Sequence, residues 1–213
     1  MSEYEVLVPW SLTPDLAWLD VVSVAWNQLP LVKSHIAAFK AQYSQRFRLT
    51  VLHDGSPDPG FVDELVGERY LGGNVRLLAT TQRFNDWGHS LRDIALRELV
   101  SLPWTLLTNA DNYYTPEFVQ QTEERAMKGG KLDVVMWNLA HNHHNHRYIK
   151  TEFALCKVDM GAFMTKTALA RNIGFNHRNA EADGYFVEEI KMRLKHTGGV
   201  LLYHFDKLFM VHN

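Results

Sequence analysis

The sequence predicts an α/β protein with a mostly parallel sheet flanked by helices, and two observations support this. Short β-branched runs alternate along the chain with segments in which apolar residues recur every three or four positions. Several runs end in turns rich in Gly, Asp and Asn, which is typical of the carboxyl ends of parallel strands. With 213 residues the chain can bury one core of ordinary size, so we expect a single compact domain over residues 1–213.

The first predicted unit is a strand, a helix and a second strand. Residues 21–25 (VVSVA) form a β-branched run of the kind found in buried parallel strands. Pro30 suits a first helical turn. Four apolar residues then fall on one face of an amphipathic helix: Val32, Ile36, Phe39 and Tyr43. Residues 47–52 (FRLTVL) return to strand character, so a Rossmann-like βαβ unit is expected.

The remaining elements are predicted from the same patterns. Further strands are expected at residues 75–79, 104–107, 134–137 and 200–203. Helices are expected over the run that contains Leu91, Ala95 and Leu99, and at residues 166–172 and 185–195. The first twenty residues show no regular pattern, and the histidine-rich segment 141–147 (HNHHNHR) is predicted to be a loop.

Composition and charge exclude several classes of protein. A formal net charge of -2 gives no broad positive field, so no nucleic-acid partner is expected. The single cysteine, Cys156, excludes an internal disulfide and a cysteine-based zinc site, and it fits a cytoplasmic location. Acidic residues with Pro9 and Pro14 argue against a secretory signal, and no run of 18 apolar residues predicts a transmembrane helix. We expect a soluble protein, for which peripheral attachment to a membrane stays open.

The histidine-rich segment raises the question of a transition-metal site, because neutral imidazoles are common zinc ligands. The histidines concerned are His141, His143, His144 and His146. Neighbouring side chains in a loop do not all converge on one ion, and no cysteine completes a tetrahedral set. Contact with a ligand, or simple exposure in a loop, is therefore the favoured interpretation.

Polar residues directly follow the predicted strand 104–107. Asn109 and Asp111 emerge where a ligand would meet the sheet edge. Oxygen ligands there suit Mg²⁺ or Mn²⁺, which normally takes one or two protein carboxylates together with substrate phosphates. The alternative is an Asx turn that leads into a helix beginning near Thr115 and Pro116.

The order of these pieces resembles the family 2 glycosyltransferases, which have the GT-A fold. The family begins with a strand, which VVSVAWNQ resembles, and continues to a DDGS-like turn, which RLTVLHDGSPDP resembles. After the strand NVRLL, the segment NDWGHSLRDIAL resembles the family's N-x-G helix start, and LLTNADNYYTPEF resembles its DxD-like strand end. The resemblance runs from about residue 21 to residue 213. It implies a nucleotide-binding half at about residues 21–115 and an acceptor-binding half at about residues 116–213.

Carried over by position, the resemblance places four residues at the nucleotide. Asp54 matches an acidic residue that contacts the uracil or ribose, whereas His53 stands where a first Asp is frequent. Arg92 matches an arginine that faces the nucleotide, and its fixed charge suits a phosphate. Asp111 matches the metal-binding carboxylate, and Asn109 replaces the first Asp of DxD while keeping an amide that can hydrogen-bond. Taken alone, Asp54 could instead cap its turn, and Arg92 could be a solvated helix residue.

The resemblance also assigns residues in the second half. Asp183 matches the general base that takes a proton from the acceptor hydroxyl, although the helix dipole also favours a carboxylate in a first turn. Glu181 is the reserve candidate, because Ala182 stands where the family often has Glu. In many GT-A enzymes a late histidine closes the metal site. His212 is the first choice for that role and His204 the rival, and either could be an ordinary, partly buried histidine.

The resemblance implies inverting transfer of a sugar, with a UDP-sugar as the expected donor and the hydroxyl of a glycan or another molecule as the acceptor. Mn²⁺ or Mg²⁺ is the expected cofactor. One alternative is a nucleotide- or glycan-binding protein of the same fold whose catalytic site has decayed, motivated by Asn109 and Ala182. Another is a nucleotidyltransferase, although VVSVAWNQLP lacks a Gly-rich phosphate loop. Because the chain is short, a homo-oligomer contact or a partner protein could complete the acceptor site.

Overall fold

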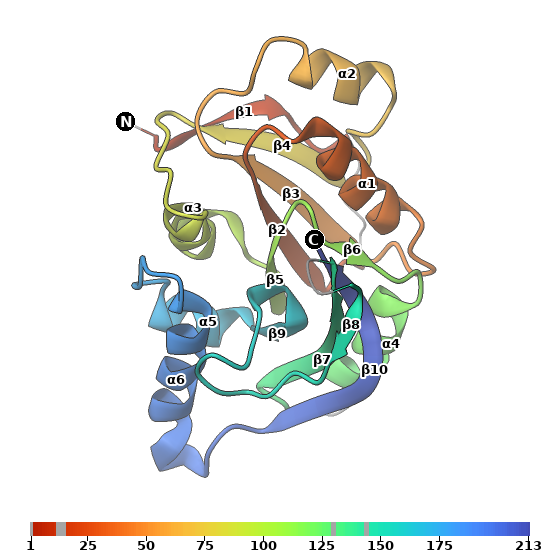
Figure 1. Cartoon of the computed structure of the whole chain (residues 1–213). Coiled ribbons are helices and arrows are strands. Elements are labelled where there is room, and N and C mark those ends of the chain that lie inside the picture. Colours follow the sequence, from red (N-terminus) through yellow and green to blue (C-terminus); the bar gives the residue numbers. More distant parts are fainter. Residues whose placement is uncertain (1, 12–15, 129–130, 143–144) are drawn as a thin grey trace.

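The computed structural model describes residues 2–11, 16–128, 131–142 and 145–213. These residues form one ten-stranded sheet with helices on both faces (Figure 1). Along the sheet the strands lie in the order β1-β4-β3-β2-β5-β9-β7-β10-β6, and β8 pairs with β7. The predicted α/β class is therefore confirmed.

Four parallel strands form the first half of the sheet. They are β2 (Leu19–Ala25), β3 (Phe47–His53), β4 (Val75–Thr80) and β5 (Trp104–Asn109). Every residue of β2 is buried, as expected of a strand covered by helices on both faces. Because β2 pairs in parallel with both β3 and β5, the carboxyl ends of these three strands meet at one edge of the sheet.

The helices divide between the two faces of the sheet. They are α1 (Leu29–Lys40), α2 (Phe61–Gly67), α3 (His89–Ile94), which continues as a π-helical turn at Ala95–Leu99, α4 (Phe118–Lys128), α5 (Thr167–Ile173) and α6 (Ala182–Leu194). Apolar residues of α1, α2 and α4 share one core with the sheet, whereas those of α3, α5 and α6 share a second core on the opposite face. Within the described residues, no helix combines the length and the apolar character needed to cross a membrane.

The second half of the sheet mixes strand directions. Its strands are β6 (Tyr113–Tyr114), β7 (Val134–His141), β8 (Arg147–Ile149), β9 (Phe163–Lys166) and β10 (Leu202–His212). β9 lies between β5 and β7 and is antiparallel to both. β10 runs parallel to β7, and its last residues pair with β6. The end of β10 therefore lies beside the turn that follows β5.

The structure differs from the predictions at β1, α1 and β10, and at both ends of the segment 141–147, where His141 and Arg147 belong to strands. β1 (Tyr4–Val8) pairs antiparallel with β4 along the sheet edge, where no regular element was expected; as a half-exposed edge strand it lacks a buried apolar run. α1 ends at Lys40, so Tyr43 lies beyond the helix and is 72% exposed. β10 continues to His212 rather than ending near residue 203, because its first residues are only partly buried and carry a weak pattern.

The histidine-rich segment joins two paired strands. His141 ends β7 and pairs with Arg147, the first residue of β8. The ring of His141 lies 4.5 Å from that of His212, measured between centroids. His146 is exposed in the connecting turn. His143 and His144 lie outside the described residues.

Candidate active site

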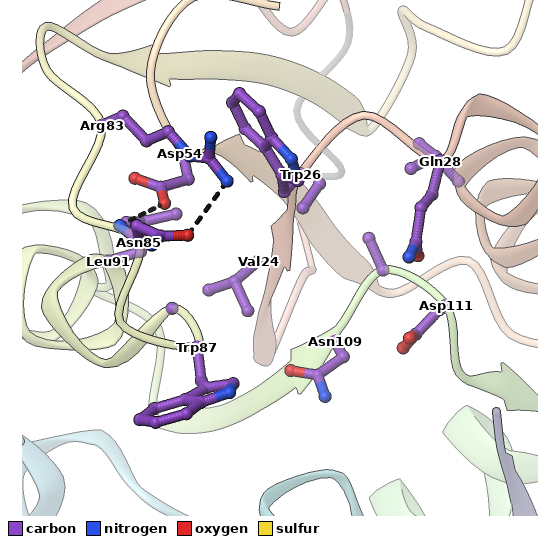
Figure 2. Close-up of a pocket in the computed structure, with 14 residues that line it drawn as sticks. Val24, Trp26, Gln28, Asp54, Arg83, Asn85, Trp87, Leu91, Asn109 and Asp111 are labelled. Atoms are coloured by element: carbon purple, nitrogen blue, oxygen red, sulfur yellow. Dashed lines mark hydrogen bonds between the residues drawn. The ribbon is translucent and has the colours of Figure 1, made fainter. Parts of the chain in front are cut away.

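A cavity of about 410 Å³ opens at the edge where β2, β3 and β5 end (Figure 2). In open α/β folds ligands bind at this edge, outside the carboxyl ends of the strands. The cavity is lined by Val24, Ala25, Trp26, Gln28, Val32, Asp54, Arg83, Asn85, Trp87, Gly88, Leu91, Asn109, Ala110 and Asp111. Three of the four residues predicted to contact a nucleotide thus share one cavity, namely Asp54, Asn109 and Asp111.

Asp54 anchors the loop that forms one side of the cavity. Its side chain is buried, and its two carboxylate oxygens accept hydrogen bonds from the main-chain amides of Phe84 (2.7 Å) and Asn85 (2.8 Å). Both oxygens therefore stabilise the backbone of the loop, so any contact with a ligand would use their remaining lone pairs.

Gly88 lets the same loop pass close over β2. Its φ is +79°, a conformation that side chains rarely adopt, and a Cβ atom there would lie 2.6 Å from Cγ2 of Val24. Both observations require glycine at this position. The neighbouring Trp87 is 73% exposed at the lip of the cavity.

Trp26 and Arg83 form a flat wall of the cavity. The guanidinium carbon of Arg83 lies 3.5 Å from the centroid of the Trp26 ring, and Nη2 of Arg83 donates to Oδ1 of Asn85 at 3.0 Å. A partly exposed indole under a guanidinium is a surface on which a planar ring can stack. Sequence reasoning missed both residues, because their contact joins two loops far apart in the chain.

His53 is a structural residue at the position where the sequence resemblance would place Asp. Its Nε2 accepts from the main-chain amide of Asn27 (2.9 Å), and its Nδ1 donates to the carbonyl of Gly55 (2.8 Å). Burial lowers the pKa of His53. The neutral ring therefore joins the loop after β2 to the loop after β3.

Arg92 is buried beneath the cavity rather than exposed to it. Its Nη1 donates to the carbonyl of Trp87 at 2.9 Å, and its Nη2 donates to Oδ1 of Asn109 at 2.5 Å. The guanidinium thus fixes the Asn109 amide, and Asn109 is one of the residues that line the cavity (Figure 2). Arg92 and Asn109 form a bonded pair, which the sequence alone did not predict.

Asp111 follows β5 at the mouth of the cavity. Its Oδ1 is buried and, among the described residues, has no hydrogen-bond partner. Burial raises the pKa of Asp111, and the nearby His212 opposes that increase. His35 holds the turn from below, because its Nδ1 donates to the carbonyl of Asn112 at 2.6 Å. A buried oxygen without a partner fits a position at which a cation or ligand can bind.

Asp159 was not singled out from the sequence, yet it belongs to a polar cluster with Asp111, Asp183, Arg92 and His212. One of its oxygens accepts from the amide of Gly161 at 2.7 Å, at the start of the 3₁₀ turn Met160–Ala162. The other lies 3.1 Å from Nδ1 of His212. Burial would raise the pKa of Asp159, but the contact with His212 brings it below the usual value. The same contact raises the pKa of His212.

Asp183 lies in the first turn of α6, as predicted. Its Oδ2 accepts from the amide of Met160 at 2.9 Å, and burial raises its pKa to about 6. The next residue, Gly184, packs so closely that a Cβ atom would lie 2.8 Å from Leu155. Glu181, the reserve candidate, is exposed at the start of the helix.

The fold brings the predicted acidic residues into one electrostatic cluster. The pKa values of Asp111 and Asp183 both respond to the charges of Arg92, Asp159 and His212. His204 is elsewhere, near the start of β10, where its Nε2 bonds to Oδ1 of Asn138 at 2.8 Å. The structure thus places His212, and not His204, beside Asp111.

The described side chains fit a cation only if a substrate completes its coordination. Among them, no group of three or more His, Cys, Asp and Glu side chains is arranged to hold a metal ion. Mg²⁺ and Mn²⁺ sites often use one or two carboxylates together with substrate phosphates. The partnerless Oδ1 of Asp111 fits one such ligand position.

A second cavity, of about 340 Å³, lies next to the cluster. Asp159 and His212 line it, whereas Asp111 lines the first cavity. Its other walls come from Leu139, His141, Ile149, Lys150, Thr151, Glu152, Cys156, Lys157 and Val158. The polar cluster therefore adjoins two separate cavities.

Comparisons with known proteins bear on this geometry. The model of glycosyl transferase family 2 matches residues 20–188 of the chain. No curated protein matches the sequence.

Three solved structures are similar to most of the chain. TarS 1-349 of S. aureus has a TM-score of 0.70 at 15% identity, covering 92% of this chain and 60% of that one. The same fragment in complex with UDP-GlcNAc gives 0.70 at 16% identity, covering 91% and 58%. The mannosyltransferase PcManGT from Pyrobaculum calidifontis, in complex with GDP-Man and Mn²⁺, gives 0.67 at 15% identity, covering 96% and 60%. These matches confirm the predicted GT-A fold, and the chain spans about 60% of the length of TarS 1-349 and of PcManGT.

Proposed function

Because the chain belongs to glycosyl transferase family 2, we propose that it transfers a sugar from a UDP-linked donor to an acceptor hydroxyl, with inversion at the anomeric carbon. The observation that carries this proposal is the placement of Asp183. Its carboxylate has a pKa of about 6 and belongs to an acidic cluster that adjoins a cavity at the carboxyl edge of the sheet.

The first cavity is the proposed donor site. Trp26 and Arg83 offer a surface on which the base stacks, and Asp54 holds the neighbouring loop in place. Asn109, fixed by Arg92, presents its amide to the ribose or diphosphate. Support for a nucleotide also comes from TarS 1-349 and PcManGT, whose structures hold UDP-GlcNAc and GDP-Man respectively.

Asp111 is the proposed protein ligand of a divalent cation, Mn²⁺ or Mg²⁺, and His212 is the second candidate. The support is the buried, partnerless Oδ1 of Asp111. When bound, such a cation offsets negative charge on the leaving diphosphate. Since Asn109 provides no charge, we expect cation affinity to depend strongly on the donor's phosphates.

Asp183 is the proposed general base. As the acceptor oxygen forms its bond to the anomeric carbon, the bond from that carbon to the diphosphate oxygen breaks, and its electron pair leaves with the diphosphate. The acceptor proton moves to the carboxylate of Asp183. The hydrogen bond from the Met160 amide holds Oδ2 in place, and a pKa of about 6 leaves the group mostly ionised at neutral pH but still a useful base.

The second cavity is the proposed acceptor site. It shares Asp159 and His212 with the polar cluster, and its walls come from residues 139–159 and the end of β10. We therefore assign the nucleotide to the half at about residues 21–115 and a glycan or another hydroxyl-bearing acceptor to the half at about residues 116–213.

A thermal-shift panel of UDP, GDP, TDP and CDP, with and without Mn²⁺, tests the donor site, because a ligand of the folded state raises Tm. We expect UDP with Mn²⁺ to give the largest shift and Asp111→Ala to remove its metal-dependent part. Asp58→Ala, an exposed carboxylate outside the cavity, is the matched control and should keep the shift. Nucleotide binding without release of UDP from any UDP-sugar would favour the binding-protein alternative.

A further inference from the structure

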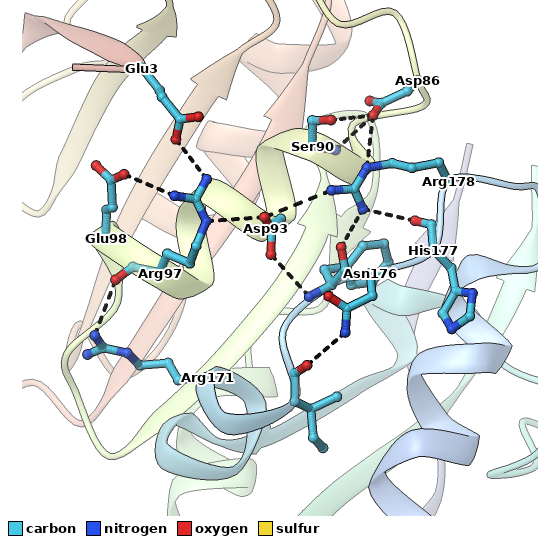
Figure 3. A network of polar contacts seen from close by, with 12 residues as sticks. Glu3, Asp86, Ser90, Asp93, Arg97, Glu98, Arg171, Asn176, His177 and Arg178 are labelled. Carbon is cyan, nitrogen blue, oxygen red and sulfur yellow. Dashed lines mark hydrogen bonds and ion pairs between the residues drawn. The ribbon is translucent and has the colours of Figure 1, made fainter. Parts of the chain in front are cut away.

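One arginine connects the loop of the donor cavity to the segment that precedes α6. Arg178 lies in the connection between α5 and α6, and its Nε is 3.5 Å from Oδ2 of Asp86. Its Nη2 is 3.9 Å from Oδ2 of Asp93 on α3 (Figure 3). The contacts therefore join the donor-side half of the chain to the half that carries Asp183.

On the donor side, Asp86 is fixed at the start of α3. Its Oδ2 accepts from the amide of Ser90 at 3.0 Å and from the Ser90 hydroxyl at 2.6 Å. The next two residues, Trp87 and Gly88, line the donor cavity. A displacement of Asp86 would therefore move the lip of that cavity.

On the other side, Arg178 also shapes its own segment. Its Nη1 donates to the carbonyls of Phe175 and His177. The amide of Phe175 in turn donates to Oδ1 of Asp93 at 3.3 Å. The planar fork of a guanidinium suits several fixed acceptors at once, which a lysine cannot reproduce.

Aromatic contacts continue the connection into α6. The Phe175 ring stacks on His89 of α3 and packs against Phe186 of α6, with 5.5 Å between centroids in each case. His177 stacks on Tyr185 at 4.6 Å. The first turns of α6, where Asp183 lies, thus rest on the segment that Arg178 holds.

No neighbouring cation could take over the contact between Arg178 and Asp86, as far as the described residues show. Among the described residues, Arg178 is the one cation within 4 Å of Asp86. Asp93 has a second cation, Arg97, which also contacts Glu3 and Glu98. Loss of Arg178 would leave Asp86 without a counter-charge while Oδ1 of Asp86 is already buried without a partner.

We propose that Arg178 is a positioning residue that fixes Asp183 relative to the donor loop at Asp86. The role of Asp183 as the base rests on the proposed function, whereas the mechanical connection between the two segments does not. Arg178 touches neither cavity, so its effect on transfer would pass through the residues it holds.

Amide hydrogen exchange of the ligand-free protein tests the connection. In Arg178→Ala we expect residues 84–90 and 182–187 both to exchange about five- to tenfold faster, because an ion pair and hydrogen bonds that close both segments are lost. Arg171→Ala is the matched control: within the described part of the chain, this arginine donates to the carbonyls of Arg97 and Val100, and both segments should stay protected. Faster exchange confined to residues 174–181 would overturn the proposal.

A second measurement separates positioning from donor binding. Arg178→Ala should bind UDP with Mn²⁺ within about threefold of the wild type, because it contacts no ligand, while losing the extra protection that UDP gives to residues 182–187. Arg178→Lys should restore part of that protection through its charge. If UDP still gave residues 182–187 the same extra protection in Arg178→Ala, the proposal would be refuted. If the wild type fails to bind any nucleotide, the proposed function fails, and the ligand-free exchange still decides on Arg178.

Discussion

Nδ1 of His212, at the end of the last strand, lies 3.1 Å from Oδ2 of Asp159, at the start of a 3₁₀ turn. Both side chains are mostly buried, with 19% and 23% of their surfaces exposed. The contact raises the pKa of His212 and, despite burial, lowers that of Asp159. The pair therefore ties β10 to the polar cluster between the two cavities.

We predict that Asp159→Asn lowers the free energy of unfolding by about 1–3 kcal/mol, because it removes a charged partner from a mostly buried pair. The pKa of His212 should fall, which an NMR titration of metal-free protein would measure. The stabilisation from His212 is present below its unfolded pKa of 6.5 and is lost as pH rises through its higher folded value. That from Asp159 is present above 3.8 and is lost as pH falls through its lower folded value.

Glu152→Gln is the control for this variant, because Glu152 is an exposed carboxylate that lines the same cavity. It should leave the His212 titration unchanged. An unaltered His212 pKa in Asp159→Asn would contradict the ion pair.

We predict that Asp183→Asn strongly lowers turnover while leaving nucleotide binding intact. Loss of a general base costs about 10²–10⁴ in kcat. In the wild type, kcat/KM should rise with pH through the Asp183 pKa of about 6 and then level off. Since that pKa is raised above 3.8, ionised Asp183 opposes folding, and the contribution of Asp183 to stability falls as pH rises from 3.8 through about 6. Asp183→Asn should therefore also raise Tm at neutral pH, whereas turnover retained with a lower Tm would point to a structural carboxylate.

Buried neutral histidines should make the fold sensitive to acid. Burial lowers the pKa of His35 and of His89 to about 4, from a usual value of 6.5. At these two positions the unfolded chain binds more protons than the folded one between these values, so their contribution to the free energy of unfolding should decrease as pH falls from 6.5 towards 4. Urea unfolding across that range would measure the slope.

His35 gives the sharpest test of this acid sensitivity, because its ring bonds the Ser23 hydroxyl at 2.7 Å and the Asn112 carbonyl at 2.6 Å. His35→Gln should be less stable at pH 7 but should lose less stability on acidification. An identical slope in the wild type and the variant would assign the proton uptake to other groups.

We predict that Gly88→Ala destabilises the protein much more than Gly60→Ala. Each glycine precedes a helix with a positive φ, +79° for Gly88 and +85° for Gly60, so each substitution carries about 1–2 kcal/mol of backbone strain. A Cβ at Gly88 would also meet Val24 at 2.6 Å, whereas nothing lies within 4 Å at Gly60. We expect overpacking to add about 1–3 kcal/mol at Gly88 alone, measured by urea unfolding. An equal loss of unfolding free energy in the two variants would mean that the loop at Gly88 can move away from β2.

Features that depend on local sequence patterns were predictable, whereas contacts between residues far apart in the chain were not. β2 and β5 were predictable, because each is a short apolar run that is buried in full or nearly so. Asp54 and Asp111 follow strands of the same parallel set, so their arrival at one sheet edge was also predictable. Local pattern and strand order were sufficient for these features.

Contacts between distant segments were not predictable in the same way. Asp159 resembles an ordinary helix cap until β10 brings His212 beside it. Trp26 and Arg83 meet only because β2 and β4 are brought into one sheet by β3. The full length of β10 was not predictable, because its first half is only partly buried and so lacks a continuous apolar pattern.

Finally, we predict that Trp26→Ala weakens UDP binding by about tenfold or more, because stacking of a base on an aromatic ring contributes about 1–3 kcal/mol. Trp26 is 38% exposed and lines the cavity that we propose for the donor, with Arg83 over its ring. Tyr43→Ala removes an exposed aromatic residue that does not line this cavity, and it should leave binding unchanged. Isothermal titration with UDP and Mn²⁺ would measure both variants. Because the Trp26 ring also packs near His53, Tm must be measured in parallel; unaltered UDP affinity in a folded Trp26→Ala protein would place the base elsewhere in the cavity.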